Sequence, residues 1–188
     1  PLNTVVGFSE LLSTEKNLSE EEIQEYSAAI KNNSEKLLAL INNILDLSRL
    51  EAGMMRFNVQ ECDAVELCRE AKMMVNMQTT LVNPEFHSTL ETLPIQADSR
   101  WFLKLLSSLL SVPRLYDGEV CQVEYTLTRE EQHLKITVKG SPLYQVWEDE
   151  QEQRILHDIN RLYLGAFKGN YQVSEGVEKV VTITYPLT

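Results

Sequence analysis

Few side chains in this sequence have the type and spacing that would predict chemistry. Cys62, Cys68 and Cys121 are an odd number of cysteines without C-x-x-C spacing, so neither a disulfide framework nor a zinc site is indicated. Free thiols in a reducing cytoplasm are expected. The acidic runs at residues 20–22 and 148–152 are predicted to lie at solvated helix starts, where negative charge opposes the positive end of the helix dipole. These residues predict no metal site.

The three histidines do not form a catalytic arrangement either. His87 is predicted in a strand or loop, His133 at the start of a strand and His157 on a late helix. We expect ordinary surface or core histidines at all three positions and predict no catalytic residue in this chain.

Composition and charge exclude several classes of partner. The 188 residues are 43% hydrophobic and 24% charged, which is typical of a folded globular protein. The net charge of −11 argues against nucleic acid and against an anionic lipid surface, because both reward clusters of Lys and Arg. No apolar run approaches the ~20 residues of a membrane span, and the abrupt start in an amphipathic pattern suggests an excised fragment.

The elements that would position functional residues begin with a predicted helical hairpin. A short amphipathic helix over residues 2–12 is followed by a long one that starts at the capping box of Ser19 and Glu22 and ends at Gly53. The short connection makes the two helices antiparallel.

The long helix has a heptad seam with a second apolar stripe beside it. The second stripe, Leu38, Ile41 and Leu45, makes the apolar face wider than one hairpin can bury, so we predict a homodimer with a four-helix bundle. The alternative is that the hairpin packs on the rest of its own chain. The predicted dimer interface consists of seam residues: Ile23, Ile30, Leu37, Leu40 and Ile44.

These helices resemble the dimerisation and phosphotransfer hairpin of two-component sensor histidine kinases. The resemblance is carried by PLNTVVGFSELL at residues 1–12 and INNILDLSRLEAG at residues 41–53. In the family, the phospho-accepting histidine opens an H-E-x-R-T-P-L motif whose last two residues match Pro1 and Leu2. The resemblance therefore implies a phospho-acceptor five residues before Pro1, outside this chain.

The remaining residues predict an α/β sandwich. Strand patterns at 56–61, 85–90 and 94–97 alternate with helices capped by Asp63 and Asp98. A strand hairpin at 119–128 and 133–139 follows. After it come a helix at 149–164 and two closing strands at 171–173 and 180–185. This order resembles the ATP-binding domain of histidine kinases, gyrase and Hsp90. We thus expect an α+β protein with a hairpin domain at 1–53, lacking its start, and a degenerate ATP-binding domain at 54–188.

The resemblance fails where the family binds nucleotide. The family's N-L-L-x-N-A run is SLLSVP at residues 108–113, so Ser108 and Val112 replace the two asparagines that hold magnesium and phosphate. Lys139 stands where the family's adenine-binding Asp is expected, and an ammonium cannot accept the adenine hydrogen bond. No glycine lies between Pro142 and Gly165 to bind phosphates. We expect these positions to be vestigial and predict no bound cofactor, although active relatives use ATP and Mg.

Three functions are compatible with this sequence, and whether the chain is an enzyme is left open. The first is a kinase core that has lost ATP binding and acts as a dimeric signalling or phosphotransfer scaffold. The second is an active autophosphorylating kinase with a reorganised pocket. The third is a dimeric protein-interaction module without enzymatic activity. Expected partners are a response-regulator receiver domain or a partner kinase, with no nucleic acid and no membrane contact. The expected location is the cytoplasm, including the cytoplasmic part of a membrane-anchored sensor.

Overall fold

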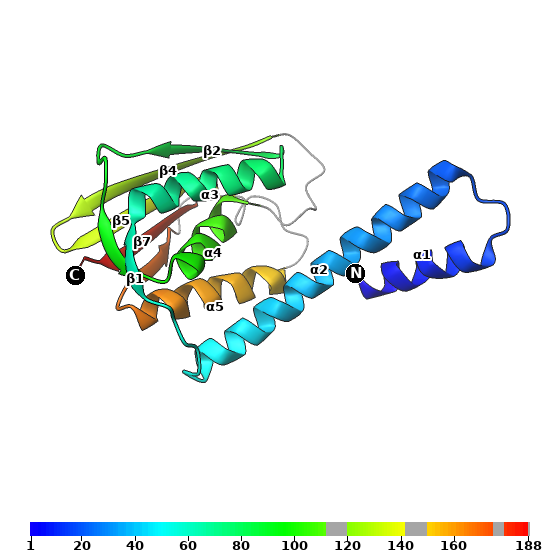
Figure 1. Ribbon diagram of the computed structural model, residues 1–188, viewed down its shortest axis with the longest axis horizontal. Helices are drawn as coiled ribbons and strands as arrows, with labels where there is room; N and C mark the ends of the chain where they lie inside the picture. The colour runs from blue at the N-terminus through cyan, green and yellow to red at the C-terminus, as the bar shows by residue number, and fades with distance from the viewer. Residues whose placement is uncertain (112–119, 142–149, 175–178, 188) are drawn as a thin grey trace. The chain divides into compact units, whose positions relative to one another are not determined.

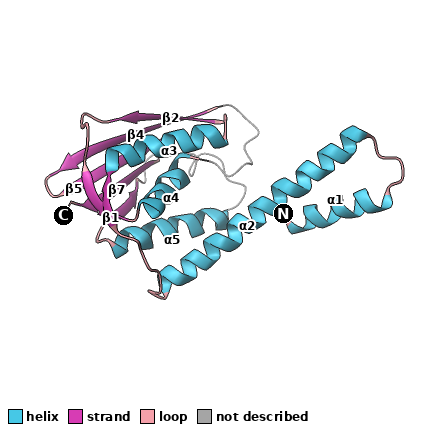
Figure 2. Cartoon of the chain, in the orientation of Figure 1, coloured by secondary structure: helices cyan, strands magenta, loops and turns pink. Residues whose placement is uncertain are grey.

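The structure, a computed structural model, describes residues 1–111, 120–141, 150–174 and 179–187. The chain divides into two compact units, Pro1–Asp46 and Leu47–Thr188. Figure 1 labels the helices and strands along the chain, and Figure 2 colours them by type. Their bounds are α1 Leu2–Thr14, α2 Glu20–Glu51, β1 Gln60–Asp63, α3 Ala64–Gln78, β2 Val82–His87, β3 Pro94–Ala97, α4 Ser99–Leu110, β4 Cys121–Glu130, β5 His133–Lys139, α5 Glu150–Ala166, β6 Asn170–Val173 and β7 Val180–Pro186.

The first unit is the predicted antiparallel hairpin of α1 and α2. The Phe8 and Tyr26 rings stack across it with centroids 5.0 Å apart. The predicted capping box is present, since the Ser19 backbone N–H donates to the Glu22 carboxylate at 2.8 Å and the Glu22 N–H donates to the Ser19 hydroxyl at 3.2 Å. The Ser19 hydroxyl also donates to the Glu22 carboxylate at 2.9 Å, and the two bonds from Ser19 to this carboxylate lower its pKa.

The second unit is built on a five-stranded mixed sheet in the order β2-β4-β5-β7-β6, with β1 and β3 as a separate antiparallel pair. The β2–β4 pair is parallel and the other pairs of the large sheet are antiparallel. Helices α3, α4 and α5 cover one face of this sheet (Figures 1 and 2). The α+β organisation predicted from the sequence is confirmed.

The core lies between the sheet and these helices. Alternate residues of β5, Leu134, Ile136 and Val138, are fully buried because every second side chain of a strand points to the same face. Opposite them, α4 buries Trp101, Phe102, Leu105, Leu106, Leu109 and Leu110. Asp98 begins α4 as predicted, accepting a hydrogen bond from the Trp101 backbone N–H at 3.2 Å.

Two predicted strands are displaced in the structure. The strand expected at residues 56–61 is found at Gln60–Asp63, and the strand expected at 85–90 is found at Val82–His87. In the first case the alternation of Phe57 with Val59 does not reflect a strand, because Phe57 packs in an aromatic cluster while Val59 is exposed. In the second, Pro84 lies inside the strand, which is possible because β2 is at the edge of the sheet.

Candidate functional site

The two sequence-predicted nucleotide positions that the structure describes, Ser108 and Lys139, do not lie together. Ser108 lies on α4 in the helical layer, and Lys139 is the last residue of β5. Val112 lies outside the described residues, as do residues 142–149 at the start of the glycine-free stretch. The candidate site therefore has two parts, the surroundings of Ser108 and the end of β5.

Ser108 is part of a polar contact between α4 and α5. Its hydroxyl donates to the Leu105 carbonyl at 2.7 Å, and the Asn160 amide nitrogen donates to the Ser108 oxygen at 2.9 Å. Asn160 is only 2% exposed, so its amide must find partners inside the protein. The serine at this position is thus hydrogen-bonded within the protein.

Asn160 extends this contact to strand β6. It also hydrogen-bonds the Tyr171 hydroxyl, which lies 2.6 Å from Nδ1 of His157. Burial lowers the pKa of His157, so the ring is neutral at pH 7 and Nδ1 can accept a hydrogen bond from the Tyr171 hydroxyl. Ser108, Asn160, Tyr171 and His157 therefore form one chain of hydrogen bonds, called here the α4–α5 network.

The end of β5 is also hydrogen-bonded to α4. Gly140, with φ of +67°, turns the chain after β5, and the following Ser141 is 1% exposed. The Ser141 hydroxyl donates to the Leu109 carbonyl at 2.6 Å. On the helix-facing side, the Ser141 side chain therefore links the end of this strand to the α4 backbone.

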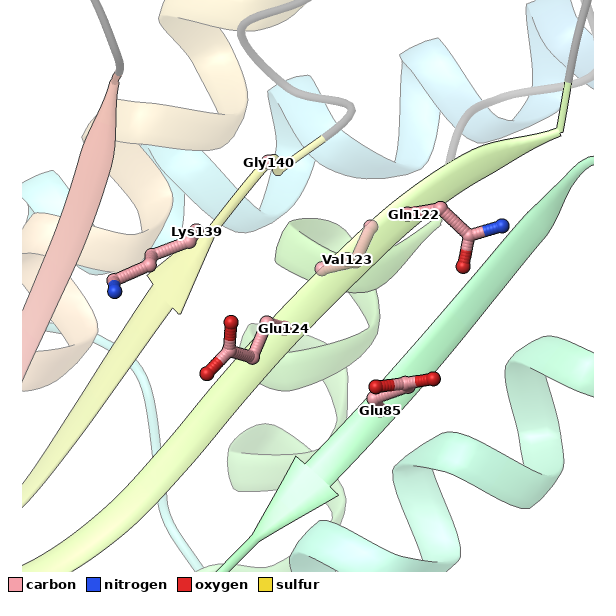
Figure 3. A pocket seen from close by; sticks show the side chains of 6 residues that line it. All are labelled: Glu85, Gln122, Val123, Glu124, Lys139 and Gly140. Carbon is pink, nitrogen blue, oxygen red and sulfur yellow. The ribbon is translucent and has the colours of Figure 1, made fainter.

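Lys139 lies on the opposite face of the sheet. Figure 3 shows its side chain on the same face as those of Glu85, Gln122 and Glu124, with the helices behind the sheet. These residues line a shallow cavity of about 360 Å³ together with Val123 and Gly140. Lys139 pairs with Glu124 across the β4–β5 ladder, and Glu124 pairs with Glu85 across β2–β4. The lysine is thus separated from Ser108 by the sheet itself.

Of these groups, sequence reasoning found Ser108 and missed Asn160, Ser141 and Tyr171. Asn160 carried a signal, because it is a polar residue between Ile159 and Tyr163 on the apolar face of the predicted helix. A polar residue at such a position needs a partner. The identity of that partner depends on the packing of α4 against α5, which sequence patterns do not specify.

The predicted dimer-interface residues differ in their exposure within the single chain. Ile30, Leu37 and Leu40 are half-buried, whereas Ile23 and Ile44 are 44% and 45% exposed. The second stripe, Leu38, Ile41 and Leu45, is 60%, 46% and 48% exposed, and Leu2 and Val6 of α1 are exposed as well. The hairpin thus carries an apolar surface that its own chain does not cover within this unit.

The described residues lack two further features. They contain no cluster of three or more His, Cys, Asp or Glu side chains arranged to bind a metal ion. None of the described helices combines the length and the apolar character that crossing a bilayer requires.

Comparison with known proteins finds a family model that matches the helical hairpin and relatives that match a longer part of the chain. Residues 1–53 match the family model of the His Kinase A (phospho-acceptor) domain. The chain is 33% identical over 114 residues to the non-motile and phage-resistance protein of Caulobacter vibrioides, and 30% identical over 117 residues to the cell-division control histidine kinase PdhS of Brucella anthropi. Each match covers 59% of this chain but only 14% and 11% of the respective relative.

Solved structures share the fold at low sequence identity. The Acinetobacter baumannii histidine kinase AdeS matches all of this chain and 95% of its own with a TM-score of 0.73 at 18% identity. The histidine kinase ThkA, solved in complex with the response regulator TrrA, matches all of this chain and 58% of its own with a TM-score of 0.71 at 16% identity.

Proposed function

We propose that this chain is the core of a sensor histidine kinase that does not bind Mg-ATP usefully and that acts as a dimeric signalling or phosphotransfer scaffold. In this proposal residues 1–53 are the dimerisation and phosphotransfer hairpin and residues 54–188 are a degenerate ATP-binding domain. The phospho-accepting histidine would precede Pro1.

The observation that carries the proposal is the α4–α5 network. Active relatives are expected to hold magnesium and phosphate with two asparagines of this helix, and here the first position is Ser108. Its hydroxyl is bonded to Leu105 and Asn160, so a metal ion would have to compete with existing hydrogen bonds. The second position is Val112, which offers no oxygen ligand to a hard cation.

The end of β5 gives further support. An adenine ring reaching the helix-facing side of this strand would meet the Ser141 hydroxyl, which is already bonded to Leu109. Lys139 lies on the face of the sheet opposite the helices and offers no hydrogen-bond acceptor to the adenine amino group. Each unsatisfied polar contact of a ligand costs on the order of 1–3 kcal/mol, so several such losses weaken binding by orders of magnitude.

Isothermal titration with ATP and MgCl2 tests the loss of nucleotide binding. We expect no saturable heat at ligand concentrations up to about 1 mM, which corresponds to a binding free energy weaker than about −4.1 kcal/mol. A dissociation constant in the micromolar range would refute the proposal and favour the active-kinase function. Circular dichroism on the same sample establishes that the protein is folded.

The scaffold function requires a dimer, and the exposed stripe of the hairpin supports a second copy of this chain as the partner. Leu38, Ile41 and Leu45 give this exposed helix face more apolar surface than an ordinary solvated face carries. Pairing two hairpins would bury these side chains in a four-helix bundle. In this arrangement the seam residues Ile30, Leu37 and Leu40 contribute from inside the hairpin, and the exposed stripe completes the interface.

Light scattering on the purified chain should give twice the chain mass of 21.6 kDa. Ile41→Asp should shift the protein to monomer, because a carboxylate would be buried between two apolar helices. Ala39→Asp is the matched control, since Ala39 is exposed on the same helix and lies about 160° around it from Ile41 at ~100° per residue. A monomer for the unmodified chain, or equal effects of the two substitutions, would refute the dimer.

A response-regulator receiver domain is the proposed partner of the dimer. The structurally similar kinase ThkA was solved with a response regulator, and the hairpin of the present chain shares its fold. The partner of this chain would be recognised on the hairpin, next to the expected phospho-acceptor.

A further inference from the structure

The segment that joins α2 to β1, residues 54–59, is fixed at its start by the end of the helix. Gly53, with φ of +64°, ends α2, and two hydrogen bonds close the turn: Gly53 N–H to the Leu50 carbonyl at 3.1 Å and Met54 N–H to the Arg49 carbonyl at 3.0 Å. This is the Schellman arrangement. Leu47 and Leu50 of the last turns pack against the core of the second unit, so the end of α2 belongs to that unit.

The middle of the segment inserts an aromatic side chain between two helices. The Phe57 ring lies 5.8 Å from Trp101 of α4, 5.6 Å from Tyr163 of α5 and 5.1 Å from Phe167, centroid to centroid. The first two contacts are edge-to-face, which is the favoured geometry of aromatic pairs. Phe57 therefore contacts both helices of the α4–α5 pair at once.

Asp98 holds the next residue of the segment. One oxygen of its carboxylate accepts from the Trp101 N–H at 3.2 Å, and the other accepts from the Asn58 N–H at 2.8 Å. The Asp98 carbonyl lies 3.5 Å from the Tyr163 hydroxyl. Asp98 is 4% exposed, so this carboxylate depends on those backbone donors. A single buried residue thus contacts the segment and α4 through its side chain, and α5 through its carbonyl.

We propose that Phe57 and Asp98 form a latch that couples the end of α2 to the spacing between α4 and α5. These two helices are joined at one end by the latch and further along by the hydrogen bond between Ser108 and Asn160. A shift of α5 against α4 would separate Trp101 from Tyr163, release Phe57 and free the turn at Gly53. This inference does not depend on whether the chain binds nucleotide.

Hydrogen exchange read by mass spectrometry on the full chain tests the latch. In Phe57→Ala, the amides of residues 50–58 should exchange faster by a factor on the order of ten or more. The aromatic contacts that this substitution removes hold the segment against α4 and α5. Val59→Ala is the matched control, since Val59 belongs to the same segment and is 47% exposed, and it should leave these rates unchanged. Unchanged rates in Phe57→Ala would overturn the proposal.

The coupling between the spacing of α4 and α5 and the segment at residues 54–59 is tested by breaking the hydrogen bond between Ser108 and Asn160. Asn160→Ala breaks the α4–α5 network without touching the segment, and it should also accelerate exchange at residues 50–58. Ser108→Ala is the milder variant for use if Asn160→Ala does not fold. Faster exchange confined to α4, α5 and β6 in the variant that folds would show that the latch does not respond to the helix spacing, and it would overturn the coupling.

Discussion

Two adjacent serines of α4 are expected to respond differently to substitution by alanine. The Ser107 hydroxyl is buried and has no hydrogen-bond partner among the described residues, whereas the Ser108 hydroxyl bonds to Leu105 and Asn160. Both positions are half-buried on the same helix, and alanine favours helix equally at both. The difference between Ser107→Ala and Ser108→Ala therefore isolates the hydrogen bonds.

The expected magnitudes follow from these contacts. Ser107→Ala removes an unsatisfied hydroxyl and should be neutral or stabilise by up to about 1 kcal/mol. Ser108→Ala should lower the free energy of unfolding by about 1–3 kcal/mol, because the Asn160 amide, 2% exposed, loses an acceptor. Asn160→Ala loses its bonds to Ser108 and Tyr171 and should cost about 2–4 kcal/mol.

Urea unfolding followed by circular dichroism measures these values. All variants are compared at one protein concentration, since the proposed dimerisation would make stability depend on concentration. The double variant Ser108→Ala with Asn160→Ala should give a coupling energy of about 1 kcal/mol. A coupling energy near zero, or equal losses for Ser107→Ala and Ser108→Ala, would refute the α4–α5 network.

Three further outcomes are expected. Burial lowers the pKa of His157 below its usual 6.5 in the folded state, so the unfolded state binds the proton more readily. Stability should therefore be complete above about pH 6.5 and fall as the pH drops below it, and His157→Gln should flatten this part of the urea-midpoint profile. Gly53→Ala should lower Tm because its φ of +64° strains a side chain by about 1–2 kcal/mol, whereas Gly7→Ala, with no atom within 4 Å, should raise it. Burial raises the pKa of Cys68 to about 12, so iodoacetamide at pH 8 should label it only after unfolding, as read by peptide mass spectrometry.

Local signals in the sequence predicted most of the fold. The capping residues Ser19, Asp63 and Asp98 each begin a helix as expected, because a side-chain cap is a contact between near neighbours in sequence. The β4–β5 hairpin was predicted for the same reason. The errors arose at Phe57 and Pro84, where tertiary packing and an edge position decide the conformation.

The candidate site was less predictable from the sequence. The resemblance identified Ser108, but its bond to Asn160 joins residues 52 positions apart, and no local pattern links them. The side of the sheet on which Lys139 lies follows from the alternation of β5, in which Leu134, Ile136 and Val138 face the helices. Successive side chains of a strand point to opposite faces of the sheet. A shift of one position in the alignment with relatives would therefore place a different face of the sheet at the expected adenine-binding position.

The proline inside β2 has a consequence for how copies of this protein can associate. β2 is an edge strand, and an exposed edge is a template on which a foreign strand can add through backbone hydrogen bonds. Pro84 lacks the N–H that such an added strand would bond, and Glu85 beside it brings a charge that an aggregating sheet would have to bury. Growth of the sheet from one molecule to the next is thereby discouraged on this side. In the proposed dimer, self-association would instead occur through the hairpin, where it would end at two copies.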